Sequence, residues 1–193
     1  MHKTKFFLQY LKNPRDVGSI TPSSKYLIKK MISQIDFPNA RYILELGSGN
    51  GCITKELLKN MDLESKLITF ETNEKFCETI SKIEDERLYI INDSAENILH
   101  YLEKLKIKKA DYIISGLPLA ILPKDTRKII LNSISKSLKE NGLYIQFQYS
   151  LRSYKQIKQL FSQVNVNFTP LNIPPAFIYI CKKGVVLSSI RCT

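Results

Sequence analysis

The sequence predicts an α/β protein with a doubly wound, Rossmann-like sheet of six or seven strands and helices on both faces. Strand-like and helix-like segments alternate along most of the chain, which is typical of a parallel sheet covered by helices. An apolar strand at residues 42–46 runs into the glycine-rich stretch 47–51 and then into a helix, as in nucleotide-binding folds. With 193 residues, 44% of them hydrophobic, the chain is long enough to bury one full core.

The predicted strands and helices follow one another in a regular order. Strands are predicted at residues 42–46, 66–71, 88–91, 110–115, 142–149 and 176–182, and helices at 52–61, 75–83, 95–105, 124–138 and 154–161. The last two strands lack a crossover of the usual length and have prolines between them, so the C-terminal edge of the sheet is predicted to be antiparallel. Residues 184–193 are predicted to form a terminal strand or a tail.

The N-terminal segment differs from the rest of the chain. Residues 3–12 predict a short basic amphipathic helix, with aromatic and leucine side chains on one face and lysines opposite. Residues 1–30 hold seven lysines and arginines against one acid, Asp16, and so carry 7 − 1 = +6 of the net charge of +11. Such a helix can lie in an anionic bilayer interface or pack as a lid on the sheet, and both interpretations stay open. The chain is therefore divided into this N-terminal part and a main domain at residues 31–193.

Composition limits where the protein is expected to be located and which partners it is expected to bind. No run approaches the roughly 18 to 20 apolar residues that span a bilayer, and no signal peptide is recognisable. We therefore expect a cytoplasmic protein, peripheral on the inner face of the membrane. The four cysteines, Cys52, Cys77, Cys181 and Cys192, lack the spacing of metal ligands, so reduced thiols and no metal site are expected. The net charge of +11 indicates nucleic acid or an acidic lipid surface as partner, unless it reflects a lysine-rich proteome.

The glycine-rich stretch predicts a cofactor site. Gly47 and Gly49 permit torsions, and a close approach of a ligand to the main chain, that side chains would prevent. Cys52 stands where the dinucleotide fingerprint has its third glycine, which argues against a dehydrogenase. Glu45, just before the turn, suits an ammonium group better than a pyrophosphate. S-adenosylmethionine carries an amino acid at one end, so the pattern favours it as the cofactor.

Acidic residues follow the next two predicted strands. Glu71 comes about 20 residues after the glycine loop, where a ribose-binding acid is expected. The alternative is an acid at the start of a helix that Asn73 caps. Asp93 can accept a hydrogen bond from an adenine amino group, cap the helix predicted to begin at Ala95, or do both.

The fourth predicted strand ends in an apolar turn, Ser115-Gly116-Leu117-Pro118-Leu119. Ligands bind at this edge of open α/β sheets. Because the turn contains no acid, nucleophile or metal ligand, we expect chemistry that works chiefly by positioning the reactants.

Two further segments join these motifs: residues 13–24 (NPRDVGSITPSS) and residues 146–150 (QFQYS). Together with the glycine loop, the acids and the turn at 115–119, they resemble the class I S-adenosylmethionine-dependent methyltransferases. Within these, the chain is similar to the branch that holds ribosomal RNA adenine dimethyltransferases and bacterial phospholipid N-methyltransferases of the phosphatidylethanolamine type. The second group is the closer match. The resemblance implies a seven-stranded sheet and an N-terminal helix that binds anionic membranes.

The resemblance also implies site residues. The implied cofactor-binding set is Thr21, Glu45, Gly47, Ser48, Gly49, Glu71, Thr72, Asp93, Ser94 and Ala95. In this set Glu45 and the loop hold the methionine end, Glu71 the ribose and Asp93 the adenine, and the segment at 19–24 closes over the cofactor. The predicted catalytic set is Ser115, Gly116, Leu117 and Pro118 of the turn, with Tyr149 and Tyr26 added on chemical grounds.

Two of these residues line the predicted substrate pocket. Tyr26 and Tyr149 are expected to face the headgroup, since aromatic faces attract a methylated ammonium, but packing in the core or at the rim explains them equally well. A backbone carbonyl near Ser115 or Gly116 is the expected proton acceptor for the amine. The nearby cations Lys25, Lys29, Lys30 and Arg152 either contact a lipid phosphate or are simply solvated.

The leading functional prediction is N-methylation of phosphatidylethanolamine, or of its methylated derivatives, at the membrane surface. Another amine-bearing lipid is a close variant. RNA adenine N6-methylation is the alternative, opposed by Gly116 and Leu119, which replace the asparagine and the base-stacking aromatic ring of the RNA enzymes, and by the missing helical domain. A non-catalytic binder would not need Glu45, Glu71 and Asp93. Nucleic acid is therefore not the expected partner, and the oligomeric state is left open.

Overall fold

The computed structural model describes residues 24–172 and 174–184. The helix predicted at residues 3–12, the segment with Thr21, and all but the first residue of the stretch at 184–193 lie outside these residues and stay predictions.

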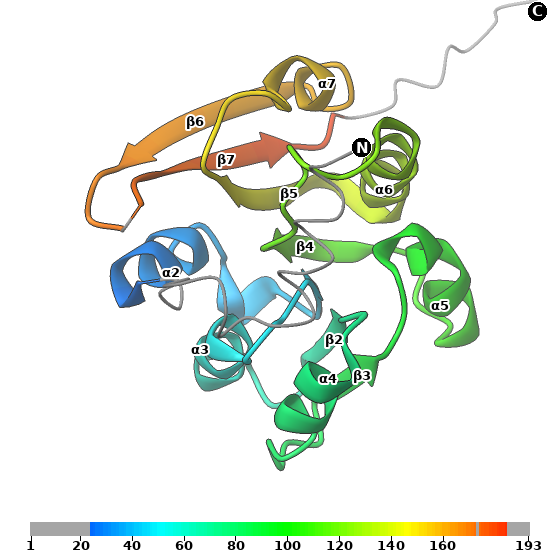
Figure 1. Ribbon diagram of the computed structural model, residues 1–193. Coiled ribbons are helices and arrows are strands. Elements are labelled where there is room, and N and C mark those ends of the chain that lie inside the picture. The colour runs from blue at the N-terminus through cyan, green and yellow to red at the C-terminus, as the bar shows by residue number, and fades with distance from the viewer. Residues whose placement is uncertain (1–23, 173, 185–193) are drawn as a thin grey trace, which may run out of the picture.

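A seven-stranded sheet forms the centre of the molecule, in the order β3-β2-β1-β4-β5-β7-β6 (Figure 1). The strands are β1 (Tyr42–Leu46), β2 (Lys66–Phe70), β3 (Leu88–Ile91), β4 (Ala110–Ser115), β5 (Leu138–Gln148), β6 (Gln163–Thr169) and β7 (Ala176–Lys182). The pairs among β1 to β5 are parallel, whereas β7 runs antiparallel to both β5 and β6. The predicted fold class, with its antiparallel C-terminal edge, is confirmed.

Helices cover both faces of this sheet (Figure 1). They are α2 (Lys25–Ile32), α3 (Cys52–Asn60), α4 (Glu74–Ile80), α5 (Ile98–Lys104), α6 (Lys124–Ser137) and α7 (Tyr154–Lys158), with 3-10 turns at Phe37–Asn39 and Ala95–Asn97. The apolar faces of α2 and α3 pack with strand residues into one core, and those of α5 and α6 pack into a second core on the opposite face. Alternate residues of β1 serve the two cores, since Ile43 belongs to the first and Leu44 to the second.

The sequence prediction missed two elements, β6 and α2. In β6, Val164 and Val166 are half-buried while Asn165 and Asn167 are exposed, an alternation that marks an edge strand. Asparagine is depleted in strands, which hid this pattern. Helix α2 begins after Ser24, whose hydroxyl accepts a hydrogen bond from the backbone N–H of Leu27.

Helix α2 also bears on the predicted division of the chain. The boundary at residue 30 falls inside this helix, whose side chains Leu27, Ile28, Met31 and Ile32 are buried against the sheet. Strand β5 begins at Leu138 rather than at residue 142. A register shift in its pairing with β4 and the left-handed conformation of Asn141 (φ 62°) allow the earlier start.

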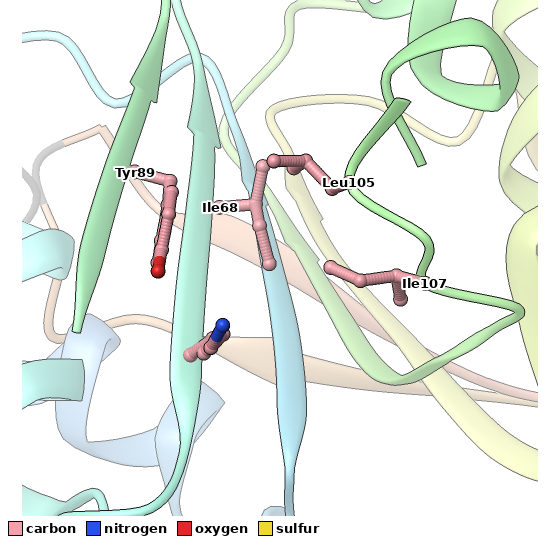
Figure 2. Close-up of a pocket in the computed structure, with 5 residues that line it drawn as sticks. Ile68, Tyr89, Leu105 and Ile107 are labelled. Atoms are coloured by element: carbon pink, nitrogen blue, oxygen red, sulfur yellow. The ribbon is translucent and has the colours of Figure 1, made fainter. Parts of the chain in front are cut away.

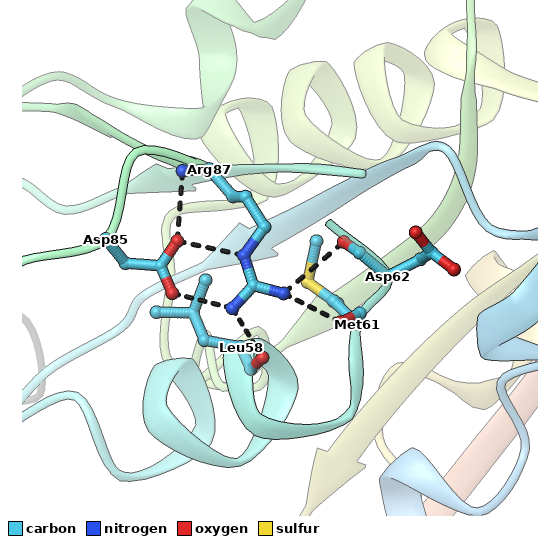
Figure 3. Close-up of polar contacts among 5 residues, drawn as sticks. All are labelled: Leu58, Met61, Asp62, Asp85 and Arg87. Atoms are coloured by element: carbon cyan, nitrogen blue, oxygen red, sulfur yellow. Dashed lines mark hydrogen bonds and ion pairs between the residues drawn. The ribbon is translucent and has the colours of Figure 1, made fainter. Parts of the chain in front are cut away.

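Arg87 joins α3 to the amino end of β3 (Figure 3). Its guanidinium donates two hydrogen bonds to the Asp85 carboxylate, at 2.9 and 2.6 Å, and three to the backbone carbonyls of Leu58, Met61 and Asp62. All five donors of the side chain are therefore used. The carbonyls at the end of a helix lack partners within it, so Arg87 acts as a side-chain cap for the end of α3.

A small cavity lies under β2 and β3, away from the edge of the sheet where the strands β1 to β4 end. Ile68, Tyr89, Leu105 and Ile107 line it, together with Lys66 (Figure 2). Its volume of about 20 Å³ leaves room for one water molecule and for no cofactor. The residues predicted to form the functional site lie at the opposite end of these strands.

Candidate functional site

Glu45 lies at the bottom of the candidate site, between β1 and α3. Its side chain is 1% exposed, and its Oε2 accepts a hydrogen bond of 2.7 Å from the hydroxyl of Thr54, the third residue of α3. Its Oε1 has no hydrogen-bond partner among the described residues. Burial raises the pKa of Glu45 from 4.5 to about 7, and the hydrogen bond from Thr54 offsets part of that effect. A buried carboxylate with an unpartnered oxygen is suited to receive a cation.

The glycine loop follows β1, and three of its residues have left-handed backbone conformations. Gly47, Gly49 and Gly51 have φ values of +76°, +52° and +78°, conformations that glycine adopts without strain. A Cβ atom at Gly47 would lie 3.0 Å from the side chain of Leu117, so the loop and the turn after β4 are in close contact. A Cβ atom at Gly49 would meet no atom of the described residues within 4 Å, so these residues leave the space above Gly49 open to a ligand.

Glu71 holds the loop from the end of β2. Its carboxylate is 6% exposed and accepts hydrogen bonds of 2.9 Å from the backbone N–H groups of Gly49 and Asn73. Each carboxylate oxygen keeps a second lone pair for a further donor. Asn73 caps α4 by accepting a hydrogen bond from the N–H of Lys75, as predicted. Thr72, between Glu71 and Asn73, is exposed.

Asp93 follows β3 and lies at the rim. It accepts a hydrogen bond from the backbone N–H of Ser94 and others from the side chain of Asn97. The first of these is the main reason that the pKa of Asp93 is lowered. The alternative that Asp93 caps the following turn is wrong, since the hydroxyl of Ser94 accepts the N–H of Glu96 and makes that cap. Ala95 is buried.

Two glutamines fix the turn after β4. The side-chain amides of Gln146 and Gln148, both in β5, donate to the carbonyl of Leu117 at 3.0 and 2.8 Å. The N–H of Leu119 donates to the same oxygen at 2.9 Å, so that carbonyl is fully engaged. The Ser115 hydroxyl accepts the N–H of Leu117 at 3.2 Å.

Three further residues complete the turn. The N–H of Gly116 donates to the Leu46 carbonyl, and a Cβ atom at Gly116 would lie 3.2 Å from the Gly47 carbonyl. Leu119 is fully buried in the core and offers no side chain to a ligand. Pro118 is half-buried. The turn therefore presents main-chain atoms rather than reactive side chains.

The two predicted tyrosines lie on different elements of the same region. Tyr149, just beyond β5, is 47% exposed, and its ring lies 5.8 Å from that of Phe147. Partial burial raises its pKa, and a hydrogen bond with Asn172 offsets part of the effect. Tyr26 is 46% exposed on α2. Asn172 connects the two elements, because its Oδ1 accepts the N–H of Ser24 at 3.0 Å.

The structure thus brings most of the predicted residues to one edge. Parallel pairing puts the ends of β1, β2, β3 and β4 side by side, so Glu45, Glu71, Asp93 and the turn at 115–119 share the edge with the loop. Sequence reasoning missed Thr54, Asn172 and the roles of Gln146 and Gln148. Their partners lie far away along the chain or in the main chain, so no local pattern marks them.

Two classes of feature are not found among the residues that the structure describes. No group of three or more histidine, cysteine, aspartate or glutamate side chains is arranged to hold a metal ion. No helix of residues 24–172 or 174–184 is long and apolar enough to cross a bilayer.

One curated relative spans almost the whole chain. The ornithine lipid N-methyltransferase of Singulisphaera acidiphila is 27% identical over 183 residues, which cover 92% of this chain and 95% of that protein. No family model matches the sequence.

Solved structures identify the fold. The precorrin-6y C5,15-methyltransferase of Geobacter metallireducens superposes with a TM-score of 0.68 at 12% identity, covering 86% of this chain and 92% of that one. The 1,6-didemethyltoxoflavin N1-methyltransferase of Burkholderia thailandensis, solved with S-adenosylhomocysteine, gives 0.68 at 11% identity, covering 94% and 87%. The chain has the class I methyltransferase fold.

Proposed function

We propose that this protein is an S-adenosylmethionine-dependent N-methyltransferase that acts on the headgroup amine of a membrane lipid. The similarity to an ornithine lipid N-methyltransferase over nearly the full length of both chains carries the proposal. The class I methyltransferase fold and a turn that works by positioning agree with it.

The residues at the edge of the sheet fit S-adenosylmethionine. The unpartnered buried oxygen of Glu45 accepts the ammonium of its methionine end. The open space above Gly49 leaves the loop accessible to the ligand, and the free lone pairs of the Glu71 carboxylate accept ribose hydroxyls. Asp93, Ser94 and Ala95 lie at the adenine end, Ser48 and Thr72 lie along the loop, and Thr21 belongs to the covering segment.

Bound S-adenosylmethionine supplies an electrophilic methyl group whose sulfonium leaves as a neutral thioether. The protein's part is to align the amine with that methyl group, which in favourable cases lowers a barrier by about 7 to 11 kcal/mol. Since the Leu117 carbonyl is saturated by three donors, the main chain of Ser115 and Gly116 is left to accept the amine N–H. Burial under the turn favours the neutral amine, whose lone pair is the nucleophile.

The choice of lipid is the finer part of the proposal. The curated relative favours an ornithine lipid, in which the amine belongs to an amino acid, over phosphatidylethanolamine, which the sequence motifs predict. Tyr26 and Tyr149 would face the ammonium as methyl groups are added. Partial exposure of both rings at the same edge agrees with that position.

The test is methyl transfer from labelled S-adenosylmethionine to defined substrates. Purified protein is incubated with anionic vesicles that contain ornithine lipid, with vesicles that contain phosphatidylethanolamine, and with total RNA. We expect label in the ornithine lipid, and label in phosphatidylethanolamine alone would move the substrate to that lipid. Label in RNA alone, or in none of the three, would overturn the proposal.

A further inference from the structure

Large apolar side chains are exposed where β5 and β6 end and β7 begins. We define the edge patch as Tyr26, Tyr149, Leu151, Phe168 and Leu171, which are 46%, 47%, 50%, 53% and 63% exposed. They come from α2, from the residues after β5, and from the end of β6 with the turn that follows it. An apolar surface of this kind usually marks an interaction site.

Specific contacts bring these segments together. Gln148 and Phe168 both pair with Phe177, so the last residues of β5 and β6 flank the start of β7. Asn172, next to Leu171, accepts the N–H of Ser24 just before α2.

A second contact ties α2 to the end of β6. The ammonium of Lys30 donates to the carbonyl of Phe168 at 3.2 Å. The turn between β6 and β7 accordingly lies beside α2 (Figure 1). The edge patch is therefore one region of the surface, although its members are far apart in the sequence.

Cations lie beside the patch on α2 and directly after β5. Helix α2 contains Lys25, Lys29 and Lys30 and no acid. Arg152 follows Leu151 directly, and in the sequence no aspartate or glutamate follows Glu140. Exposed apolar side chains flanked by cations match an anionic lipid surface, in which rings and leucines enter the acyl boundary and lysines meet the headgroups.

We propose that the edge patch is a membrane-docking surface, with Phe168 and Leu171 inserting into an anionic bilayer. The inference rests on the proposed function, because docking would bring a lipid headgroup to the candidate site. The patch lies at the edge where β4 ends in the turn at 115–119, because β4 and β5 are parallel. It contains no residue of the helix predicted at residues 3–12, which lies outside the described residues.

A single fluorophore tests insertion directly. The chain contains no tryptophan, so Leu171→Trp gives the full-length protein one indole at the patch. Leu63→Trp is the matched control, because Leu63 is 84% exposed between α3 and β2, at the opposite end of the sheet. With phosphatidylglycerol vesicles, which carry no amine, we expect a blue shift and quenching by brominated acyl chains for Leu171→Trp only. Equal responses from both variants, or none from Leu171→Trp, would overturn the proposal.

A binding assay supplies the second readout. Phe168→Ser/Leu171→Ser is expected to lower partitioning into the same vesicles about tenfold or more, whereas Leu63→Ser leaves it unchanged. Wild-type partitioning of the double variant would refute docking by this surface. Thermal unfolding checks that both variants are folded.

The assays also separate this inference from the proposed function. Neither vesicle experiment contains S-adenosylmethionine or an amine lipid, so each reports on docking alone. Methylation of a short-chain amine lipid in micelles measures the chemistry without a bilayer. We expect the double variant to keep that activity, and absence of that activity in the wild-type protein would count against the proposed function and not against docking.

Discussion

At the scale of single residues, the site depends on groups whose partners are main-chain atoms. Glu71 binds the glycine loop through the N–H of Gly49, and two glutamines hold the turn after β4 through the carbonyl of Leu117. In Glu45 one carboxylate oxygen has no partner in the described part of the protein, and the buried hydroxyl of Ser48 in the glycine loop lacks one as well. These two residues thus differ from those that shape the site, and Glu45 is the residue that we expect to bind a charge.

The raised pKa of Glu45 predicts a pH-dependent stability. The folded-state pKa of about 7 exceeds the ordinary value of 4.5. Burial of the charge therefore does not destabilise the protein at low pH, where the group is protonated in both states, and the loss of stability grows as pH rises from 4.5 to 7. Glu45→Gln should remove that cost and stabilise the cofactor-free protein by up to about 3 kcal/mol at pH 8. Urea unfolding of both proteins at pH 5 and pH 8 measures this change in the free energy of unfolding. Glu64→Gln, at an exposed acid, should change neither value.

Cofactor binding should depend on the same proton. An ammonium binds the ionised form of Glu45, so the affinity for S-adenosylmethionine should rise between pH 6 and 8 with release of a proton. Titration calorimetry in two buffers of different ionisation enthalpy detects that proton. In Glu45→Gln we expect weaker binding with no pH dependence. Unchanged affinity in this variant would remove Glu45 from the site.

The glutamine contacts predict an effect on rate rather than on cofactor affinity. Gln148→Met keeps the approximate volume but removes the donor to the Leu117 carbonyl. The turn then loses part of its fixed position, and the rate of methyl transfer should fall about tenfold or more, because alignment is the main source of catalysis. Comparison of kcat with the dissociation constant of S-adenosylmethionine measures this. Equal losses in both would indicate a general structural role instead.

At the scale of elements, side chains close the ends of helices and attach them to the sheet. Arg87 caps α3, and Asn172 fastens the start of α2 to the turn between β6 and β7. Both contacts cross long distances in the sequence. The Asn172 contact helps to explain why α2, which the sequence prediction missed, is fixed to the sheet.

Removal of the Arg87 cap should destabilise the protein. Arg87→Ala leaves the carbonyls of Leu58 and Met61 without the guanidinium donors, and leaves the Asp62 carbonyl and the Asp85 carboxylate with backbone donors only. The expected cost is about 2 to 4 kcal/mol in the free energy of unfolding. Arg41→Ala is the control, because Arg41 is exposed and its main chain makes the hydrogen bonds to Asp111 and Lys66. Arg41→Ala should change the free energy of unfolding by no more than about 0.5 kcal/mol. Similar effects of the two substitutions would refute the capping role.

At the scale of the whole molecule, function is concentrated at one edge of the sheet. Most of the residues predicted to bind the cofactor lie at the ends of β1, β2 and β3. The turn at 115–119 follows β4, and the edge patch lies beside β5, β7 and β6. A lipid that docks at the patch would thus reach the turn from the side opposite the adenine end.

Charge at that edge predicts a salt effect on turnover. Lys25, Lys29 and Arg152 lie beside the edge patch, and salt screens their attraction to anionic headgroups. Activity on lipid in anionic vesicles should therefore fall several-fold as sodium chloride rises from about 0.1 to 0.5 M. Activity on a short-chain substrate in neutral micelles should change little. Equal salt sensitivity for both substrates would place the effect on the enzyme itself.

The sequence by itself determined the fold class, the positions along the chain of six of the strands, and the edge where the predicted site lies. Apolar runs, the turn glycines and the acids after successive strands are local signals, because each reflects the needs of neighbouring backbone. The tertiary structure alone decided which groups meet: Thr54 with Glu45, two glutamines with Leu117, and Asn172 with Ser24. It also decided that β6 is a strand. These outcomes depend on burial and on partners distant in the chain, which a local pattern does not encode.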